Sequence, residues 1–365
     1  MRSSIGQLLM AGFTGTSIPV ELRSLAREFS LGGIILFKRN VVEPEQVAEI
    51  AVEAATLTTD IPVWVAVDQE GGRVARLKRP FTEWPPMLSL GRAGDETLAR
   101  RFARALAAEL LAVGVTLDFA PVLDVLTNVK NPAIGDRALA EDVAMVSRLG
   151  TAIIEELQQA GLASCGKHFP GHGDTTVDSH HELPIVEHPP DRLRAIEFEP
   201  FRAAIRVGVA SLMTCHVLVP AFDEERPATL SPKIVEPLLR GELGFDGVVF
   251  SDDLDMKAVS ARYPVPDAAT DAIAAGCDAA LICSGDVQVQ AAAIETLIHA
   301  VEDERIPFRR VEQALGRMRR MKERFLLQPV RQGGAARGPL TGRALRAAIG
   351  LEAHAAIAEE MARHL

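Results

Sequence analysis

The chain has 365 residues, of which 48% are hydrophobic and 24% are charged, and its formal net charge at pH 7 is −10. This composition is typical of a globular protein with a large buried core, so we do not expect disorder over most of its length. The negative charge argues against a general binder of nucleic acid or of anionic membranes, because both targets attract clustered positive charge. A small, neutral ligand fits this charge better.

The N-terminal segment MRSSIGQLLMAGFTG carries one arginine and only a short apolar stretch. The stretch is too short for the core of a signal peptide or for a membrane-spanning helix. The four cysteines lie in or beside apolar segments without CxxC spacing, at Cys165, Cys215, Cys277 and Cys283. That pattern is typical of buried free thiols in a reducing compartment. We therefore predict a cytoplasmic protein.

Eight short apolar runs recur along the chain and suit strands that are buried on both faces, as parallel sheets require. They are LLMAGF (8–13), GGIILF (32–37), PVWVAVD (62–68), TLDFAPVLDV (116–125), ASCGKHFP (163–170), ASLMTCH (210–216), GVVFSDD (247–253) and AALICSG (279–285). Eight such strands predict a closed barrel. An open, doubly wound sheet is the rival, but no GxGxxG motif follows an early strand to support nucleotide binding.

Amphipathic stretches separate these runs, and the clearest cover residues 96–114 and 142–161. Each ends on a glycine, the residue that commonly follows the last turn of a helix. Repeated strand–helix units predict an α/β fold, the (β/α)8 TIM barrel, in one domain over residues 1–327. Residues 328–365 begin with QPVRQGGAARGPLTGRALR and end in an Ala-rich helical pattern. This segment predicts an Arg/Gly/Ala-rich linker followed by a docking helix.

Polar and charged residues gather where the apolar runs end. They are Lys38, Arg39, Asp68, Glu70, Asp124, Lys167, His168, His216, Asp252 and Asp253. In a barrel of parallel strands these ends form one rim, where active sites are built. Residues that are distant in sequence are therefore expected to converge.

The segment KHFPGHGDTTVDSHHELP, residues 167–184, holds four of the nine histidines. Within it, Asp178 can fold back onto His180 and hold the imidazole through one ring nitrogen, which leaves the other nitrogen free to transfer protons. Ser179 is a poor candidate nucleophile because no GxSxG motif surrounds it. A metal site is a stronger alternative, since five side chains of this loop are possible ligands, although their spacing matches no HExxH-like frame: His168, His172, Asp174, His180 and His181.

Two further motifs place carboxylates at strand ends. In GVVFSDDLDM, residues 247–256, Asp252 is the best placed for catalysis, whereas Asp253 and Asp255 suit a capping or supporting role. In VDQEGGRVARL, residues 67–77, carboxylates and arginines can either clamp sugar hydroxyls or pair with one another; these are Asp68, Glu70, Arg73 and Arg76. Arg137 in IGDRA is equally ambiguous.

Six motifs occur in one order along roughly residues 5–325: VAVDQEGGRVARL, FAPVLDV, IGDRA, KHFPGHGDTTVDSHHELP, LMTCH and FSDDLDM. Together they resemble the β-N-acetylglucosaminidases of glycoside hydrolase family 3, in particular the single-domain type that acts in peptidoglycan recycling. The histidine-rich segment is the most specific part of the resemblance. The tail after Phe325 has no counterpart that we can assign.

The resemblance implies a TIM-barrel enzyme that retains the anomeric configuration. Asp252 would be the nucleophile, His180 the general acid and base, and Asp178 the group that orients and charges His180. A histidine in this role departs from the usual carboxylate pair of retaining glycosidases. The residues implied to bind N-acetylglucosamine are Asp68, Arg76, Arg137, Lys167, His168 and His216.

The implied substrate is a small carbohydrate, a muropeptide fragment with N-acetylglucosamine on anhydro-N-acetylmuramic acid. No cofactor, metal, nucleic acid or membrane is implied, and the protein is expected to be a monomer or a weak homodimer. Three alternatives stay open: a phosphorylase that uses phosphate in place of water, a metal-dependent barrel hydrolase, and a sugar-binding barrel without turnover. The length of the 167–184 loop also suggests that the dyad enters the site only when substrate binds.

Overall fold

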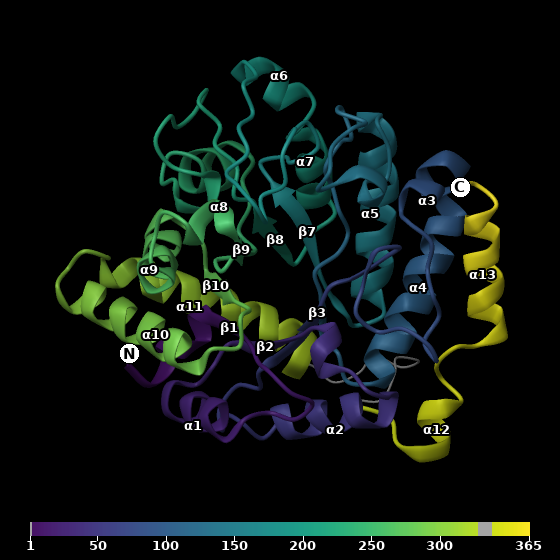
Figure 1. Ribbon diagram of the computed structural model, residues 1–365, viewed down its shortest axis with the longest axis horizontal. Coiled ribbons are helices and arrows are strands. Elements are labelled where there is room, and N and C mark those ends of the chain that lie inside the picture. Colours follow the sequence, from purple (N-terminus) through teal and green to yellow (C-terminus); the bar gives the residue numbers. More distant parts are fainter. Residues whose placement is uncertain (1, 328–337) are drawn as a thin grey trace.

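The computed structural model describes residues 2–327 and 338–365, and its centre is a closed barrel of eight parallel strands (Figure 1). Around the barrel the strands follow the order β1-β2-β3-β6-β7-β8-β9-β10, and β10 pairs with β1. They are β1 (Leu9–Gly12), β2 (Gly33–Leu36), β3 (Trp64–Val67), β6 (Leu117–Asp118), β7 (Ala163–Phe169), β8 (Ser211–Thr214), β9 (Val248–Asp253) and β10 (Ala279–Ile282). Each strand lies within one of the eight predicted runs, so the predicted TIM barrel is confirmed.

Helices surround the barrel and connect its strands (Figure 1). The larger ones are α1 (Val20–Phe29), α2 (Pro44–Ala54), α4 (Glu96–Ala112), α5 (Val143–Gln159), α7 (Glu199–Arg206), the π-helix η5 (Val235–Glu242), α9 (Val265–Ala275), α10 (Val287–Glu302) and α11 (Phe308–Lys322). Shorter segments are η1 (Arg2–Leu8), η2 (Lys38–Asn40), α3 (Leu88–Ala93), η3 (Gly135–Arg137), α6 (Pro190–Ala195), η4 (Ala228–Leu230), α8 (Lys257–Ser260) and η6 (Glu323–Leu327). None of the helices within the described residues combines the length and the apolarity needed to cross a membrane.

The two helices predicted most clearly, α4 and α5, begin and end as their sequences indicate. The Asp95 side chain accepts a hydrogen bond from Thr97 N at the start of α4, and Asp142 accepts one from Met145 N at the start of α5. These caps satisfy backbone N–H groups that have no partner within the helix. Gly114 and Gly161 follow the two helices with φ of +80° and +96°, a conformation that residues with a side chain rarely adopt.

The core has two layers, which explains why the strands are apolar on both faces. One layer fills the space between the strands and the helices, and the other fills the barrel interior with side chains such as Trp64, Phe119 and Phe250. At the end where the strands begin, Met318 and Met321 of α11 join this interior layer. The barrel is therefore closed at that end and opens at the carboxyl ends of its strands.

A two-stranded antiparallel hairpin interrupts the barrel pattern directly after β3. It consists of β4 (Gln69–Gly71) and β5 (Val74–Ala75). The Gln69 side chain fixes the returning strand, because its Oε1 accepts hydrogen bonds from Arg76 N at 2.8 Å and from Leu77 N at 3.0 Å. The hairpin, which the sequence did not predict, turns the chain so that Arg76 comes back to the end of β3.

The C-terminal tail from residue 338 onward lies against the outside of the barrel. It forms α12 (Gly342–Arg346) beside α2 and α13 (Glu352–Ala362) beside α4 (Figure 1). The first ten residues of the predicted linker, 328–337, lie outside the described residues. The domain boundary at residue 327 stays a prediction.

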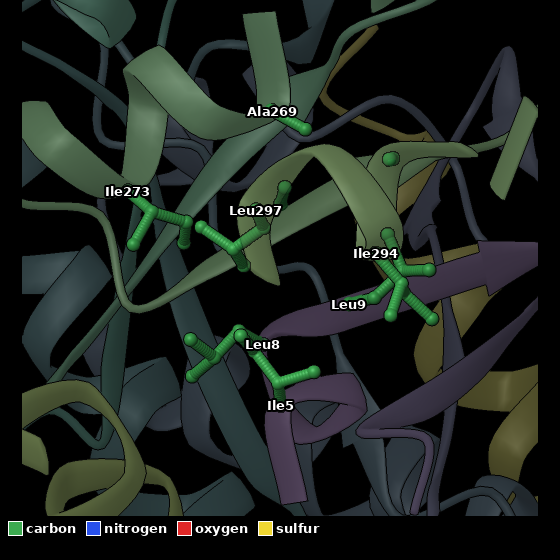
Figure 2. A pocket seen from close by; sticks show the side chains of 9 residues that line it. Ile5, Leu8, Leu9, Ala269, Ile273, Ile294 and Leu297 are labelled. Atoms are coloured by element: carbon green, nitrogen blue, oxygen red, sulfur yellow. The ribbon is translucent and has the colours of Figure 1, made fainter. Parts of the chain in front are cut away.

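A void of about 10 Å³ remains between η1, β1, α9 and α10 (Figure 2). Its lining is apolar throughout: Ile5, Leu8, Leu9, Ala269, Ile273, Ala280, Ala293, Ile294 and Leu297. A space of this size holds at most one water molecule, and an apolar lining offers that water no hydrogen bonds. We therefore regard it as a packing defect of the core and not as a binding site.

Asp278, at the closed end of the barrel just before β10, pairs with three arginines. Its Oδ2 lies 2.6 Å from Arg240 Nη2, and its Oδ1 lies 2.9 Å from Arg310 Nη2 and 3.3 Å from Arg317 Nη1. Asp278 is fully buried, and it also accepts a hydrogen bond from the backbone of β9 at Val249 N. This one carboxylate therefore compensates several buried positive charges.

Replacing Asp278 by alanine should lower the free energy of unfolding by about 3–5 kcal/mol, because it leaves buried guanidinium groups without their partner. Chemical denaturation followed by circular dichroism measures this change. Asp246→Ala is the matched control, since the exposed Asp246 pairs with Arg317 and Arg320 at the surface and should cost less than about 1 kcal/mol. Equal losses in the two variants would contradict the assigned role of Asp278.

Candidate active site

A cavity of about 220 Å³ lies at the carboxyl ends of the barrel strands. Seven of the nine predicted site residues line it: Asp68, Arg76, Arg137, Lys167, His168, His180 and Asp252. The other two, Asp178 and His216, lie behind the lining and contact residues of the cavity wall. Parallel strands that end at one rim thus bring together residues up to 184 positions apart in sequence, from Asp68 to Asp252.

Lys167, at the end of β7, holds a buried positive charge between two carboxylates. Its Nζ lies 2.8 Å from Asp68 Oδ1 and 2.6 Å from Glu70 Oε1, and Arg76 Nη2 lies 3.1 Å from Asp68 Oδ2. Burial alone would raise the pKa of Asp68, but the charges of Lys167 and Arg76 outweigh it and hold that pKa well below its usual range. For Glu70 the opposing charges of Arg137 and Lys167 likewise outweigh burial and lower the pKa to about 2. Both carboxylates are therefore ionised at neutral pH.

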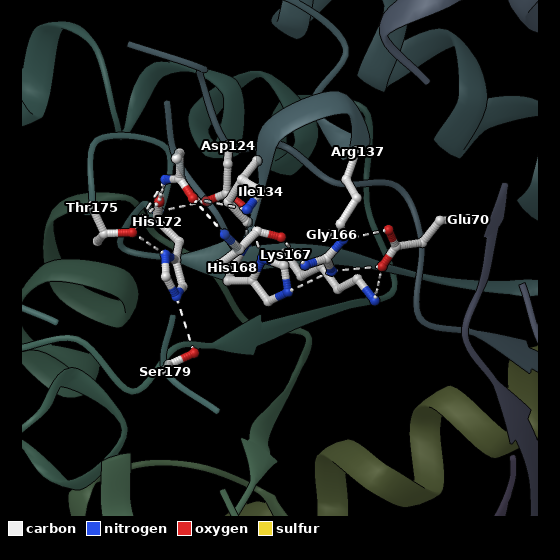
Figure 3. A network of polar contacts seen from close by, with 12 residues as sticks. Glu70, Asp124, Ile134, Arg137, Gly166, Lys167, His168, His172, Thr175 and Ser179 are labelled. Atoms are coloured by element: carbon white, nitrogen blue, oxygen red, sulfur yellow. Dashed lines mark hydrogen bonds and ion pairs between the residues drawn. The ribbon is translucent and has the colours of Figure 1, made fainter. Parts of the chain in front are cut away.

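Arg137 continues this network toward the histidine-rich loop (Figure 3). It donates two hydrogen bonds of 2.8 Å to the two oxygens of Glu70, and its Nη2 lies 3.4 Å from His168 Nε2. His168 Nδ1 lies 2.7 Å from Asp124 Oδ2. Because a carboxylate can only accept, His168 Nδ1 donates a hydrogen bond to Asp124, and His168 Nε2 faces the N–H groups of Arg137.

His172 lines the cavity, yet its ring is engaged within the protein. Its Nδ1 lies 2.7 Å from Thr175 Oγ1 and its Nε2 lies 3.1 Å from Ser179 Oγ, while its backbone N–H donates to Asp124 Oδ1 (Figure 3). Burial lowers the pKa of His172 to about 4, against a partly opposing effect of the Asp124 charge. The neutral ring of His172 thus connects Thr175 with Ser179 inside the loop.

Asp178 and His180 form a hydrogen-bonded pair at the cavity edge. Asp178 Oδ1 accepts from His180 Nδ1 at 2.7 Å and from the His180 backbone N–H at 2.9 Å. Burial would raise the pKa of Asp178, but these hydrogen bonds lower it, so Asp178 is ionised at neutral pH. The His180 side chain is 63% exposed and keeps its Nε2 free for a ligand.

Ser179, between the two members of this pair, is buried and attaches the loop to the body of the protein. Its hydroxyl lies near His172, and its carbonyl accepts a 3.1 Å hydrogen bond from Ala258 N at the start of α8. Since α8 follows β9, this contact connects the dyad loop to the strand that carries Asp252. Entry of the dyad only upon substrate binding stays a prediction.

Asp252 is the penultimate residue of β9 and is partly buried in the cavity wall. Its Oδ1 accepts a 2.8 Å hydrogen bond from Asp253 N, which leaves Oδ2 available to a ligand. Asp253 and Asp255 both accept from Cys283 N, at 3.1 and 2.8 Å, and so tie the end of β9 to the end of β10. Burial, followed by the charges of Asp255 and Asp252, raises the pKa of Asp253 to about 7.

His216 is fully buried and does not belong to the cavity lining. Its Nε2 lies 2.9 Å from the Asp253 carbonyl oxygen, and its Nδ1 lies 2.9 Å from Thr229 Oγ1. The carbonyl can only accept, so Nε2 donates, and burial lowers the pKa of the ring in agreement with a neutral tautomer. His216 thus supports the strand end that carries Asp252, and the contact with sugar predicted for it stays a prediction.

The structure adds polar residues that sequence reasoning did not include among the site residues. Glu70 and Asp124 stood out as strand-end carboxylates, but nothing in their motifs showed which cations they contact. Asn131 carried no signal at all, although its Nδ2 donates to the His172 carbonyl at 2.7 Å and its Oδ1 accepts from Ala133 N and Ile134 N. Such a role depends on loop geometry that only the folded chain defines.

The histidines of the 167–184 loop point to different partners, which separates the possible metal ligands. His168 pairs with Asp124, His172 with hydroxyls, and His180 with Asp178, while Asp174 pairs with His188 outside this segment. Among residues 2–327 and 338–365, no three His, Cys, Asp or Glu side chains form a group suited to a metal ion. The cavity is lined instead by the Asp252 carboxylate and by the imidazole of His180, which the hydrogen bond to Asp178 orients.

Known proteins share the sequence pattern and the fold of this chain. Residues 1–321 match the family described as Glycosyl hydrolase family 3 N terminal domain. The chain belongs to glycoside hydrolase family 3. Among curated family members, it is 40% identical over 282 residues to a beta-hexosaminidase of Thiobacillus denitrificans, which covers 76% of this chain and 78% of the relative. It is 36% identical over 301 residues to a beta-hexosaminidase of Stenotrophomonas maltophilia, covering 81% and 87%.

Solved structures of the family agree as well. A family 3 beta-N-acetylglucosaminidase from Paenibacillus superposes with a TM-score of 0.91 at 40% identity, over 100% of this chain and 68% of that one. NagZ from Neisseria gonorrhoeae, in complex with N-trifluoroacetyl-D-glucosamine, superposes with a TM-score of 0.78 at 32% identity, over 98% and 97%. The family 3 protein described here is therefore a glycoside hydrolase that acts as a β-N-acetylhexosaminidase.

The low pKa of His172 predicts that the enzyme loses stability in mild acid. Below pH 6.5 the unfolded chain takes up a proton on this histidine, whereas the folded protein does so only near pH 4. The free energy of unfolding should therefore fall as the pH drops through this window, by up to about 3 kcal/mol from this group. Denaturant titrations at pH 7, 5.5 and 4.5 measure the fall.

His172→Asn should flatten this pH dependence, because asparagine does not titrate. His181→Asn is the control, since the exposed His181 belongs to the same loop and its removal should leave the slope unchanged. A slope for His172→Asn equal to that of the wild type would rule out a buried neutral His172.

Proposed function

We propose that the protein is a retaining exo-β-N-acetylglucosaminidase that removes terminal N-acetylglucosamine from muropeptide fragments during peptidoglycan recycling. The observation that carries the proposal is a single cavity lined by Asp252 and His180, with His180 held by the Asp178 carboxylate. A nucleophile and a proton carrier on one cavity are what a two-step glycoside hydrolysis needs. We further propose that substrate is the principal partner, without nucleic acid or membrane.

Asp252 is proposed as the nucleophile that attacks the anomeric carbon and forms a covalent glycosyl-enzyme. One of its oxygens is held by Asp253 N, so the other can approach the sugar in a defined orientation. The leaving oxygen departs with a proton, and water then attacks the same carbon from the face that the leaving group vacated. Two inversions at one carbon amount to retention.

His180 is proposed as the acid that protonates the leaving oxygen and as the base that afterwards activates water. With Nδ1 donating to Asp178, Nε2 is the nitrogen that exchanges protons with the substrate. The ionised Asp178 stabilises the imidazolium form, in the manner of the aspartate in serine hydrolase triads. One residue can serve both steps because an imidazole can donate a proton in the first step and accept one in the second.

The opposite wall of the cavity is proposed to bind the hydroxyl and acetamido groups of the sugar. Asp68, Arg76, Lys167, Arg137 and His168 present alternating acceptors and donors whose own charges are already paired. A cavity of about 220 Å³ is smaller than the roughly 300–1,000 Å³ of sites for larger ligands, which favours one terminal sugar ring and exo action. NagZ from Neisseria gonorrhoeae, in complex with N-trifluoroacetyl-D-glucosamine, supports this choice of sugar.

The aglycone is proposed to be an anhydro-N-acetylmuramoyl unit, with the enzyme acting in the cytoplasm as a monomer or weak homodimer. The resemblance to the peptidoglycan-recycling type supports the aglycone. The four cysteines are all buried and free, in agreement with a reducing compartment. No cofactor takes part in the proposed steps.

A fluorinated N-acetylglucosaminyl donor that slows hydrolysis of the glycosyl-enzyme should label Asp252. Mass spectrometry of the peptide containing GVVFSDDLDM would assign the adduct to one of its three aspartates. Asp252→Asn should show no adduct, whereas Asp253→Asn should still be labelled at Asp252. An adduct on another residue, or full turnover without any adduct, would refute the proposed nucleophile.

His180→Ala should slow substrates with poor leaving groups by about 10²–10⁴-fold, the usual contribution of general acid catalysis. Aryl glycosides with activated leaving groups need little protonation, so their glycosylation step should be affected much less. Presteady-state kinetics on matched pairs of aglycones measures the difference, and His181→Ala serves as the neighbouring control. Equal losses on both classes of substrate would argue against a leaving-group acid.

A further inference from the structure

Glu109, in the last turn of α4, is a buried carboxylate outside the active site that joins two distant parts of the chain. Its Oε1 accepts hydrogen bonds from Thr82 Oγ1 at 2.6 Å, from Gly350 N at 2.9 Å and from His354 Nδ1 at 2.8 Å. Its Oε2 accepts from Thr82 N at 2.9 Å. Two of these four donors belong to the C-terminal tail and two belong to the segment that follows the β4-β5 hairpin.

On the tail side, the fit to the barrel is close. Gly350 has a φ of +59°, and a Cβ added to it would lie 2.2 Å from the Pro80 carbonyl oxygen, so only glycine lets the tail approach the loop before Thr82. An ion pair of 2.8 Å between Arg101 and Glu360 holds α13 along α4 (Figure 1). The tail thus covers Glu109 and supplies the donors that a buried carboxylate requires.

On the cavity side, Thr82 leads directly to the hairpin that carries Arg76. Trp84, two residues after Thr82, packs edge-on against Phe102 of α4 and accepts a 2.8 Å hydrogen bond from Gly72 N at the tip of the hairpin. The hairpin orients Arg76 through the Gln69 side chain. A shift of Thr82 would therefore be transmitted through Trp84 and the hairpin to Arg76, and would change the position of Arg76 relative to Asp68.

A second contact connects the tail with Arg137. Helix α13 also packs against α3, and α3 approaches the loop after Arg137 so closely that a Cβ on Gly91 would lie 1.6 Å from the Leu139 carbonyl oxygen. Arg73 of the hairpin in turn donates to the Ala133 and Ile134 carbonyls, at 2.7 and 3.0 Å. Hydrogen bonds thus join the hairpin to the segment that carries Arg137, and this segment in turn lies against α3, which contacts the tail.

We propose that the C-terminal tail is a brace for the sugar-binding wall of the cavity, and that Glu109 and His354 are positioning residues for substrate binding. The proposal rests on the proposed function in that it takes Asp68, Arg76 and Arg137 as sugar ligands. Asp252 and His180 come from β9 and from the loop after β7, and within the described residues their side chains form hydrogen bonds to Asp253 and Asp178 and not to the braced segments. Loosening the brace should therefore weaken binding of the sugar and leave the chemical steps nearly unchanged.

His354→Ala tests the brace, because it removes one donor to Glu109 from the tail alone. We expect KM to rise about 3- to 10-fold while kcat stays within a factor of two, and the Kd of N-acetylglucosamine to rise in parallel with KM. His354→Gln should restore both constants, since its amide can donate to the same carboxylate oxygen. His364→Ala, at an exposed histidine of the same tail, is the matched control and should behave like the wild type.

A purely structural role for the tail would give a different pattern. His354→Ala would then lower the melting temperature but leave KM and the Kd of N-acetylglucosamine unchanged, and this result would overturn the proposal. A fall in kcat without a change in KM would overturn it as well. If His354→Ala fails to fold, Glu109→Gln provides the same comparison, because its amide cannot accept all four hydrogen bonds.

Hydrogen exchange separates this proposal from the proposed function, because it needs no substrate. Backbone amides of residues 72–84 should exchange faster in His354→Ala than in His364→Ala, while amides of β9 should exchange at equal rates. If residues 72–84 exchange faster in His354→Ala but the wild-type protein has no glycosidase activity, the proposed function is refuted. The inference that the tail stabilises the hairpin segment then still holds. Equal exchange in the two variants would refute the brace, whatever the activity.

Discussion

The buried ammonium group of Lys167 holds one wall of the cavity together. A charge removed from water needs partners, and Lys167 has two of them, Asp68 on one side and Glu70 on the other. Arg76 and Arg137 extend the same alternation of charge. The ends of β3 and β7, the β4-β5 hairpin and the loop that carries Arg137 are thereby linked to one another. A wall made of paired charges is rigid, and it presents hydrogen-bonding atoms whose protonation does not change near neutral pH.

The other side of the cavity follows a different physical logic. His180 is mostly exposed and bonded to a single carboxylate, whereas His168 and His172, in the same stretch of sequence, are buried within hydrogen-bond networks. Burial lowers the pKa of His172 to about 4 and removes it from acid–base chemistry in the neutral range. One residue type therefore serves as structural support at His172, as a proposed sugar ligand at His168 and as the proposed proton carrier at His180, and the environment of each ring makes the difference.

The features that can be predicted from the sequence are those that a single local property decides. Parallel strands buried on both faces must be apolar throughout, so all eight barrel strands could be predicted, and terminal glycines marked the ends of α4 and α5 well. The sequence did not predict the β4-β5 hairpin, because the glycine pair at its tip is compatible with many kinds of turn. The tail was predicted to dock, but the contacts of Gly350 and His354 with Glu109 join residues more than 240 positions apart.

Local patterns in the sequence predict the order of strands and helices, and with it the rim on which Asp68, Lys167, His180 and Asp252 meet. This follows because the carboxyl ends of all strands in a parallel barrel point the same way. Which of these side chains contact one another depends on the folded chain. Burial, charge pairing and hydrogen-bond geometry between distant segments placed His216 behind the wall, joined Glu70 to Arg137, and bound the tail to the loop that supports Arg76. Such contacts depend on distances in space that no spacing along the chain encodes.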